Sequence, residues 1–356
     1  MFKRISDPAF DMDAPVLKDE SVRDYQYYSY DAQQPNQRGR IELQVQDTSR
    51  YFLPAEAFIE VEGEILNNAH PAAPVAYGVD VRVGFVNNGI MALFDSATYM
   101  IDGKNIESIQ KDVDVATTIP GLARYSDDYS RSAGPSMMFA KDTTNFPDSR
   151  NQVFRQPNDR VLPNPAPSNA IEDLPFPNTE FNLGFATRRA MLKDNRRTFS
   201  CAIPLSHIFR FCRDVRKVIF GAKHTVVLVR KSTDNDAIWR PIGDAGMVIL
   251  TKLSLWMPVM TPSIAEEQRL LSFMDQGGKS MLSWLTTTTD AIQSAINGLF
   301  TWQIASQQGV SAPRHIFIAL QDAARVDSQL RSIMVFDKIG VSEVSLRIIG
   351  HLYINY

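Results

Sequence analysis

The chain has 356 residues, of which 44% are hydrophobic and 22% are charged, and its formal net charge at pH 7 is -3. This composition is typical of a folded globular protein and excludes the disordered and membrane classes. The length suits two domains, or one large β domain with insertions.

Apolar runs stop short of the length that a membrane span needs. The stretch "MVILTKLSLWMPVM" is broken at Lys252 and Pro258, so we expect no transmembrane segment. The charged N-terminus lacks the apolar core of a signal peptide. Cys201 and Cys212, the only cysteines, lie in or beside apolar runs, which predicts reduced core residues.

Residues 1–40 are polar and show no periodic apolar face, so we expect an N-terminal arm. One interpretation is a floppy terminus. The other is an arm that docks on a neighbouring subunit through its aromatic rings, because aromatic residues are enriched at interfaces. The candidate interface residues of the arm are Tyr25, Tyr27, Tyr28 and Tyr30.

From residue 41 the apolar residues alternate with polar ones. Ile41, Leu43 and Val45 fall on one face of an extended chain, and this pattern indicates half-buried strands. Eight strands are expected, at 41–47, 56–66, 79–86, 90–101, 104–109, 198–205, 216–230 and 247–257.

Two turn signals punctuate these strands. Asn87-Asn88-Gly89 and Asp102-Gly103 both contain residues that tolerate positive φ, and the first can support a tight hairpin.

Residues 110–197 lose the strand pattern and are rich in Pro, Asn, Asp and Ser. Loops of this length are usually functional or disordered. This one keeps many aromatic residues, so we expect a partly ordered insertion that packs on something. Its candidate contact residues are Met137, Met138 and Phe139.

After Pro258, "MPVMTPSIAEEQ" indicates a linker into a second unit. Short helices are expected at 264–275 and at 290–300, the latter with Asp290 as N-cap. Strand signals return in "RHIFIAL" and in "VSEVSLRIIGHLYINY".

Eight strands without alternating helices predict a mainly β protein, an antiparallel jelly-roll sandwich. The expected domains are an N-terminal arm at 1–40, a first jelly roll at 41–260 that contains the insertion 110–197, and a partial second jelly roll at 261–356.

No motif for catalysis or for a metal stands out. The five histidines are far apart in the sequence, and His207 and His224 are interpreted as satisfied core or surface residues. Asp234 and Asp236 are interpreted as part of a solvated turn. We therefore expect no cofactor, no metal and no enzyme activity.

Two basic clusters, "RRAMLKDNRR" and "FRFCRDVRK", could face nucleic-acid phosphates. Because the whole chain is slightly acidic, solvated loops or salt bridges between subunits are favoured over a nucleic-acid contact.

Three segments carry a family resemblance. "VNNGIMALFDSATYMIDGKNIES", "FSCAIPLSHIFRFCRDVRKVIFGAKHTVVLVRKSTDNDAIWR" and "VILTKLSLWMPVM" resemble strands and turns of double jelly-roll major capsid proteins of tailless double-stranded DNA viruses, the adenovirus, virophage and Polinton-like lineage. The likeness covers most of residues 41–260. Residues 261–356 are too few for a complete second roll of eight strands.

The resemblance implies a structural protein that self-assembles through trimeric capsomers into an icosahedral shell. Its partners would be copies of itself, in a homotrimer and in neighbouring capsomers, and penton or minor capsid proteins. It would be made in the host cytoplasm or nucleus and act in the virion. Trp239 and Arg240 would sit in an exposed loop at a strand end.

The alternative function is a jelly-roll binding module, a lectin-like or ligand-like trimer without catalysis. An enzyme on a sandwich scaffold would need a convergent set of titratable residues, for which the sequence offers no candidate.

Overall fold

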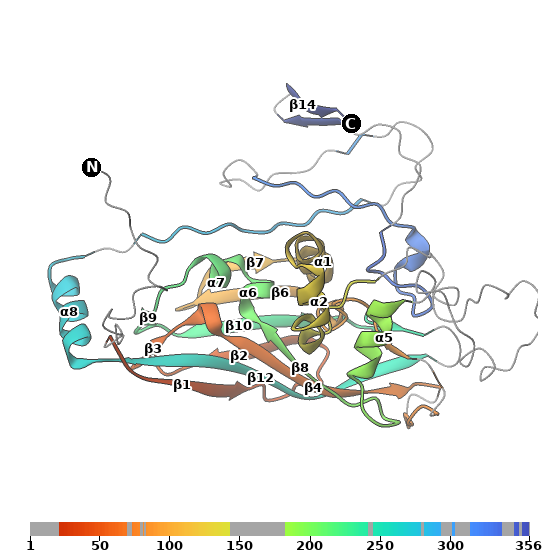
Figure 1. The fold of residues 1–356 in the computed structure, drawn as a ribbon, viewed down its shortest axis with the longest axis horizontal. Coiled ribbons are helices and arrows are strands. Elements are labelled where there is room, and N and C mark those ends of the chain that lie inside the picture. Colours follow the sequence, from red (N-terminus) through yellow and green to blue (C-terminus); the bar gives the residue numbers. More distant parts are fainter. Residues whose placement is uncertain are drawn as a thin grey trace, which may run out of the picture.

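Two antiparallel sheets lie face to face and enclose one apolar core (Figure 1). The computed structural model describes residues 21–69, 73–78, 81, 83–142, 182–240, 245–278, 281–292, 301–302 and 314–336, and the backbone of 345–348 and 351–355. Alternation in the sequence becomes alternation in space, since Ile59 and Val61 point into the core while Glu60 and Glu62 face outward.

The first sheet is built around one long strand, β12 (Gly246–Pro262), which pairs with β4 (Phe58–Asn67) on one edge. Its other edge pairs with β1 (Val22–Asp31). Ser254 of β12, for example, lies opposite Glu60 of β4 on one side and Asp31 of β1 on the other. The remaining strands of this six-stranded sheet are β3 (Tyr51–Phe52), β8 (Phe199–Pro204) and β9 (Ile219–Phe220).

The second sheet has four strands in the order β2 (Gly39–Val45), β10 (His224–Arg230), β6 (Phe94–Ile101) and β7 (Lys104–Ile109). β10 is valine-rich, and such β-branched residues suit a central strand. A two-stranded piece joins β5 (Gly84–Phe85) to β11 (Ile238–Trp239). The prediction of a mainly β, antiparallel sandwich is confirmed.

The predicted strands agree with these bounds to within a few residues, with three differences. The expected strand 216–230 divides into β9 and β10, and 90–101 begins as the 3-10 helix η3 (Met91–Leu93). Of 79–86, only β5 is a strand, and residues 79, 80 and 82 lie outside the described residues.

The two turn signals have different outcomes. Asp102 and Gly103 have φ values of 49° and 74° and join β6 to β7 in a tight hairpin, as their sequence indicates. Asn88 also has a positive φ, 57°. The prediction of a tight hairpin at Asn87-Asn88-Gly89 is wrong, however, because β5 pairs with β11 and the turn leads into η3.

The interpretation of 110–197 as a loop needs correction. Its described part is mostly helical, with α1 (Val113–Arg124), α2 (Asp127–Arg131), η4 (Gly134–Met137) and α5 (Leu183–Ala190). Pro120 and Gly121 lower the intrinsic helix propensity of α1, but packing decides. A Cβ at Gly121 would lie 2.8 Å from the Phe139 ring, so glycine lets that ring pack against the helix. Residues 143–181 lie outside the described residues.

Short helices also close the ends of the strands: η2 (Pro54–Glu56), α6 (Leu205–Ile208) and α7 (Arg210–Asp214). After β12, the predicted helix 264–275 is confirmed as α8 (Ile264–Asp275). The linker prediction is wrong for residues 258–262, because β12 continues through Pro262 and pairs there with β1 and β3.

Residues 281–292 and 314–336 then run back along the sandwich in largely extended form, with one turn of helix, η5 (Ala323–Arg325) (Figure 1). No strand forms at 314–320, so the strand predicted for "RHIFIAL" is wrong. The final signal is confirmed as an antiparallel pair, β13 (Ser345–Ile348) and β14 (His351–Asn355). Residues 290–292 are not helical, and 293–300 lie outside the described residues. The domain boundaries remain predictions.

Candidate assembly surface

The four arm tyrosines lie on β1, an edge strand of the first sheet. Alternation divides them: Tyr28 and Tyr30 pack against the core, whereas Tyr25 and Tyr27 are 38% and 40% exposed. The Tyr25 hydroxyl donates to the Glu56 carboxylate at 2.6 Å. A floppy terminus is therefore wrong for residues 22–31, which pair with β12 of the same chain. Residues 1–20 lie outside the described residues.

An aromatic row crosses the outer face of this sheet. The ring centroids of Tyr27 and Phe58 are 5.7 Å apart, and those of Phe58 and Trp256 are 6.0 Å apart and stacked. Glu60 beside them accepts hydrogen bonds from the Lys252 ammonium at 2.7 Å and from the Trp256 indole at 2.8 Å. The row is half-buried, apolar and flanked by polar groups, which is the composition of an interface core with its rim.

The candidate contact residues of the insertion lie in the core and not on the surface. Met137, Met138 and Phe139 are at most 1% exposed, and the Phe139 ring packs edge-on against Tyr125 with centroids 5.2 Å apart. Their side chains fill this chain's own core. A contact between subunits through them would require that core to open.

Trp239 and Arg240 differ from the expectation of an exposed loop. Trp239 is 2% exposed and packs edge-on against Phe185 with centroids 3.7 Å apart, so its predicted exposure is wrong. Arg240 is half-buried, and its Nε donates to the Gln329 side-chain oxygen at 2.9 Å. The sequence could not show this, because Gln329 is distant along the chain.

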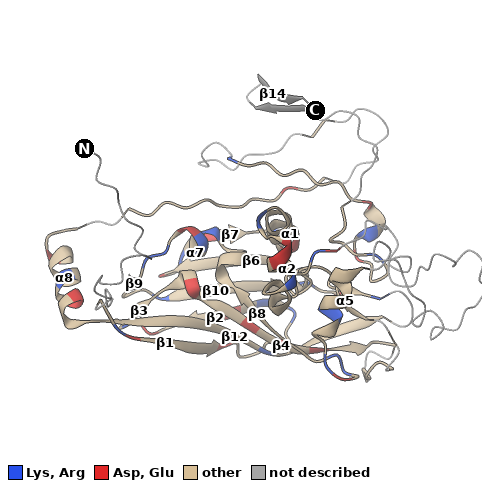
Figure 2. Ribbon diagram, in the orientation of Figure 1, with Lys and Arg blue, Asp and Glu red and all other residues tan. Residues whose placement is uncertain are grey.

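Other predicted surface charges are also structural. Asp234 is 4% exposed and binds Arg38 through two oxygens at 2.6 and 2.7 Å, so it does not belong to a solvated turn. In the first basic cluster, Arg188 is buried and pairs with Asp142 at 2.7 Å. Lys and Arg are interspersed with Asp and Glu over the described part of the sandwich (Figure 2).

Sequence reasoning missed the exposed apolar side chains that follow β12 along the chain. We call them the C-terminal apolar segment and define it as residues 264–278, 281–292 and 316–318. No residue of α8 is buried, and the exposed apolar side chains of the segment are Ile264, Leu271, Phe273, Met274, Met281, Leu282, Ile292, Ile316, Phe317 and Ile318. Exposed apolar groups of this kind mark protein interaction sites. The signal in the sequence was the run "LLSFM" within the predicted helix 264–275.

Part of this segment is fixed on the sandwich. Trp284 packs edge-on against Phe211 with centroids 5.1 Å apart, and the Leu285 backbone N–H donates to the Asp214 carboxylate at 3.1 Å. The Thr289 hydroxyl donates to the Lys111 carbonyl at 2.6 Å. These contacts hold residues 284–289 against the sandwich and leave α8 beyond its edge (Figure 1).

A second anchor holds the chain further on. Gln329 is 4% exposed, and its side-chain amide exchanges two 2.7 Å hydrogen bonds with the N–H and carbonyl of Gly246. Ile333 and Met334 join the core cluster of the sandwich. Residues 329–334 are therefore part of the first sandwich's packing.

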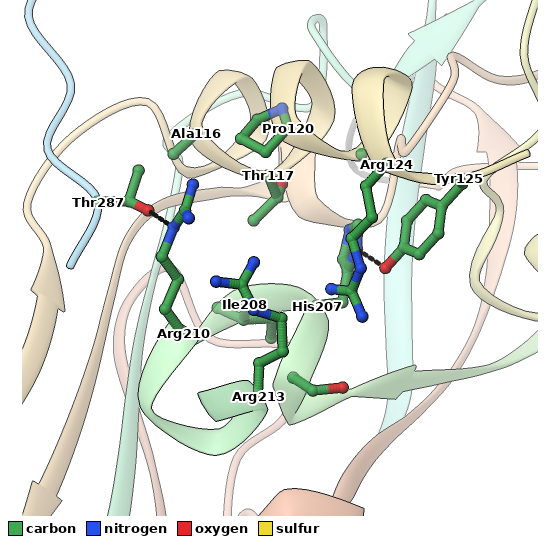
Figure 3. A pocket seen from close by; sticks show the side chains of 12 residues that line it. Ala116, Thr117, Pro120, Arg124, Tyr125, His207, Ile208, Arg210, Arg213 and Thr287 are labelled. Atoms are coloured by element: carbon green, nitrogen blue, oxygen red, sulfur yellow. Dashed lines mark hydrogen bonds between the residues drawn. The ribbon is translucent and has the colours of Figure 1, made fainter. Parts of the chain in front are cut away.

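The Asn-Asn-Gly turn lies at a buried polar network. The Asn88 amide donates to the Thr117 and Thr118 hydroxyls at 2.8 and 2.9 Å, so its oxygen is left to accept from His207 Nε2 at 3.2 Å. The other ring nitrogen of His207 then accepts from the Tyr125 hydroxyl at 2.9 Å (Figure 3). Every member has a partner, so the imidazole is stable in its neutral form.

Electrostatics agrees with this assignment. Burial, with a smaller effect of the Arg124 cation, lowers the pKa of His207 to about 4. Burial also lowers the pKa of His224 to about 4, and its Nδ1 lies 2.7 Å from the Tyr99 hydroxyl. The interpretation as a satisfied core histidine is confirmed for His207, although it lies on α6 and not on a strand. His224 is a core histidine with a partner on Nδ1 alone, because its buried Nε2 has none. Among the described residues, no group of three or more His, Cys, Asp or Glu could hold a metal ion.

The sandwich and its antiparallel topology define a β protein of the jelly-roll kind. Residues 181–355 match the family model "Double jelly roll-like domain". The family resemblance seen in the sequence is thereby confirmed. No curated protein sequence matches the chain.

Solved structures similar to this chain include three from viruses. The Sputnik virophage structure is 13% identical with a TM-score of 0.42, and the match covers 74% of this chain and 53% of that one. The mavirus major capsid protein is 12% identical with a TM-score of 0.35, and the match covers 73% of this chain and 52% of that one. The Faustovirus major capsid protein is 8% identical with a TM-score of 0.42, and the match covers 72% of this chain and 57% of that one. The match thus spans little more than half the length of those chains. No helix in the described part of this chain has the length and apolar character needed to cross a membrane.

Proposed function

We propose that the protein is a structural capsid subunit that associates with copies of itself. Two findings support this: the double jelly roll-like domain at 181–355, and the sequence resemblance to double jelly-roll major capsid proteins. A subunit of this kind acts through rigid sandwiches and large contact surfaces, and the role needs no catalysis.

The observation that carries the proposal is the C-terminal apolar segment. α8 leaves Leu271, Phe273 and Met274 between 47% and 49% exposed, and Ile264 70% exposed. A 12-residue helix without buried residues is marginal by itself in water, so a neighbouring molecule that covers this helix would stabilise it. The proposed partners are further copies of the chain in trimeric capsomers, with penton or minor capsid proteins as additional neighbours. The proposed place of action is an icosahedral virion.

The first test is the mass of the purified protein in solution, by light scattering after size exclusion, with negative-stain imaging of the same fractions. We expect trimers, or shells built from them. A monomer at every concentration would contradict the proposal and favour the jelly-roll binding module.

A charge variant localises the contact. Leu271→Lys with Phe273→Lys adds two positive charges to exposed apolar positions of α8, and we expect association to weaken at least tenfold because a charge buried at an interface without a partner is costly. The matched control, Gln268→Lys with Asp275→Asn, changes the net charge of the same helix equally at exposed polar positions and should assemble normally. If both variants associate like the wild type, α8 is not part of the interface.

A further inference from the structure

A small pocket lies between α1 and the α6–α7 turn, outside the proposed assembly contacts on α8. Its volume is about 20 Å³. Three arginines line it: Arg124 from the end of α1, and Arg210 and Arg213 from α7. Figure 3 shows their guanidinium groups directed into the same space, with Thr287 of the extended segment at one side.

The positive charge in this pocket is compensated only in part. No carboxylate is among its lining residues. Asp214 pairs with Arg213 and accepts from its Nε at 2.9 Å. Glu107 accepts from the Phe211 backbone N–H at 2.8 Å, and its charge and that of Asp214 partly offset the lowering of the Arg210 pKa. Arg210 uses its Nε to donate to the Thr287 hydroxyl at 2.6 Å, which supplies no negative charge.

The three cations also act on one another and on their surroundings. Burial and the Arg213 cation lower the pKa of Arg210. Arg124 lies close enough to His207 to contribute to the lowered pKa of that imidazole. Holding like charges together in a half-buried site costs free energy, which a bound anion would recover.

The donor set fits one kind of anion. Guanidinium groups match the oxygens of phosphate in paired hydrogen bonds, and the hydroxyls of Thr117 and Ser206 also line the space. We propose that this pocket binds a single phosphate group, either free or presented by the backbone of a nucleic acid.

The test uses the full-length protein, with inorganic phosphate and a 12-nucleotide single-stranded DNA as separate probes, at constant ionic strength in chloride buffer. Binding is measured by titration calorimetry and by the shift in melting temperature. The variants are Arg124→Gln and Arg213→Gln. The control is Arg216→Gln, which removes the same charge at an exposed position outside the pocket.

We expect phosphate to bind the wild type and Arg216→Gln equally, and both pocket variants at least tenfold more weakly. Without phosphate, Arg124→Gln should melt no lower than the wild type, because it relieves repulsion. Binding of the DNA alone with the same arginine dependence supports the pocket and identifies the nucleic-acid backbone as the source. If neither probe binds, or if both bind the pocket variants as tightly as the control, the proposal is overturned.

Discussion

At the scale of single residues, Asn88 of the Asn-Asn-Gly turn has two roles: its backbone adopts a positive φ, and its side chain holds a buried hydrogen-bond network. Its positive φ was readable from the residue types. Its buried hydrogen bonds to Thr117, Thr118 and His207 were not, because those partners are distant along the chain and lie on helices α1 and α6.

Replacing Asn88 should separate the two roles. Asn88→Gly keeps the backbone conformation but leaves buried partners unsatisfied, and we expect the free energy of unfolding to fall by about 3 kcal/mol. Asn88→Ala adds backbone strain at φ 57° and should cost about 1 kcal/mol more. Urea unfolding of both variants measures the difference. Equal stability of Asn88→Ala and the wild type would show that the network contributes nothing.

The buried histidines predict an acid-sensitive fold. The pKa of His207 is about 4 in the folded protein, against 6.5 in the unfolded chain, so the unfolded chain takes up the proton first. Stability from this residue is fully present above pH 6.5 and is lost as the pH falls towards 4. Between pH 7 and pH 5 the loss should be about 2 kcal/mol.

The measurement is the free energy of unfolding at pH 7 and at pH 5 for the wild type and for His207→Gln. Other groups titrate similarly in both proteins, so the difference between their pH dependences isolates His207. A variant with the same pH dependence as the wild type would contradict the assignment of a neutral, buried imidazole.

At the scale of elements, β1 has one face against the core and one towards solvent. Tyr28 and Tyr30 pack against the core, and the Arg50 guanidinium lies 4.1 Å from the Tyr28 ring centroid. Tyr25 and Tyr27 are on the opposite face. The strand was missed in the sequence because an edge strand with mostly exposed residues shows no apolar alternation.

Alanine pairs on β1 test the two faces. Tyr28→Ala with Tyr30→Ala should lower the free energy of unfolding by about 2 to 4 kcal/mol, because both rings lose apolar contact area. Tyr25→Ala with Tyr27→Ala should change stability by less than about 1 kcal/mol and should weaken self-association, if the outer aromatic row is a contact. Thermal unfolding and light scattering of both pairs decide this. Unchanged assembly in the second pair removes the arm tyrosines from the interface.

The pairing of β4 with β12 depends on a close approach at Gly63. A Cβ there would lie 2.3 Å from the Ile249 carbonyl oxygen and 2.8 Å from the Phe199 ring, next to a register shift in β12. We expect Gly63→Ala to destabilise the protein by about 3 kcal/mol. Gly78→Ala is the matched control, since its nearest neighbour, a Val81 methyl, is at 3.6 Å. The comparison is the midpoint of urea unfolding, and equal midpoints would contradict the close approach.

At the scale of the whole molecule, the chain beyond β12 was expected as a separate unit that begins a second roll. Residues 284–289 and 329–334 instead pack against the first sandwich. Trp284→Ala should therefore lower the stability of the sandwich by about 3 kcal/mol, through the loss of its contact with Phe211.

Phe317→Ala removes a 48% exposed ring and should change the free energy of unfolding by less than about 1 kcal/mol. Both are measured by thermal and urea unfolding of the full chain. If Trp284→Ala melts like the wild type, the extended segment does not stabilise the sandwich in solution.

The sequence by itself determined the β class, most strand positions, the hairpin at Asp102-Gly103 and helix α8, because alternation, turn residues and caps act over a few neighbouring residues. Only the tertiary structure decided the burial of Met137, Met138, Phe139 and Trp239, the pairing of β1 with β12, and the convergence of Arg124 with Arg210 and Arg213. These features join residues distant along the chain, and packing overrides the local preferences of Pro120 and Gly121 in α1. The tertiary structure also decided that α8 is exposed, since the same sequence pattern would suit a helix with one face buried against a core.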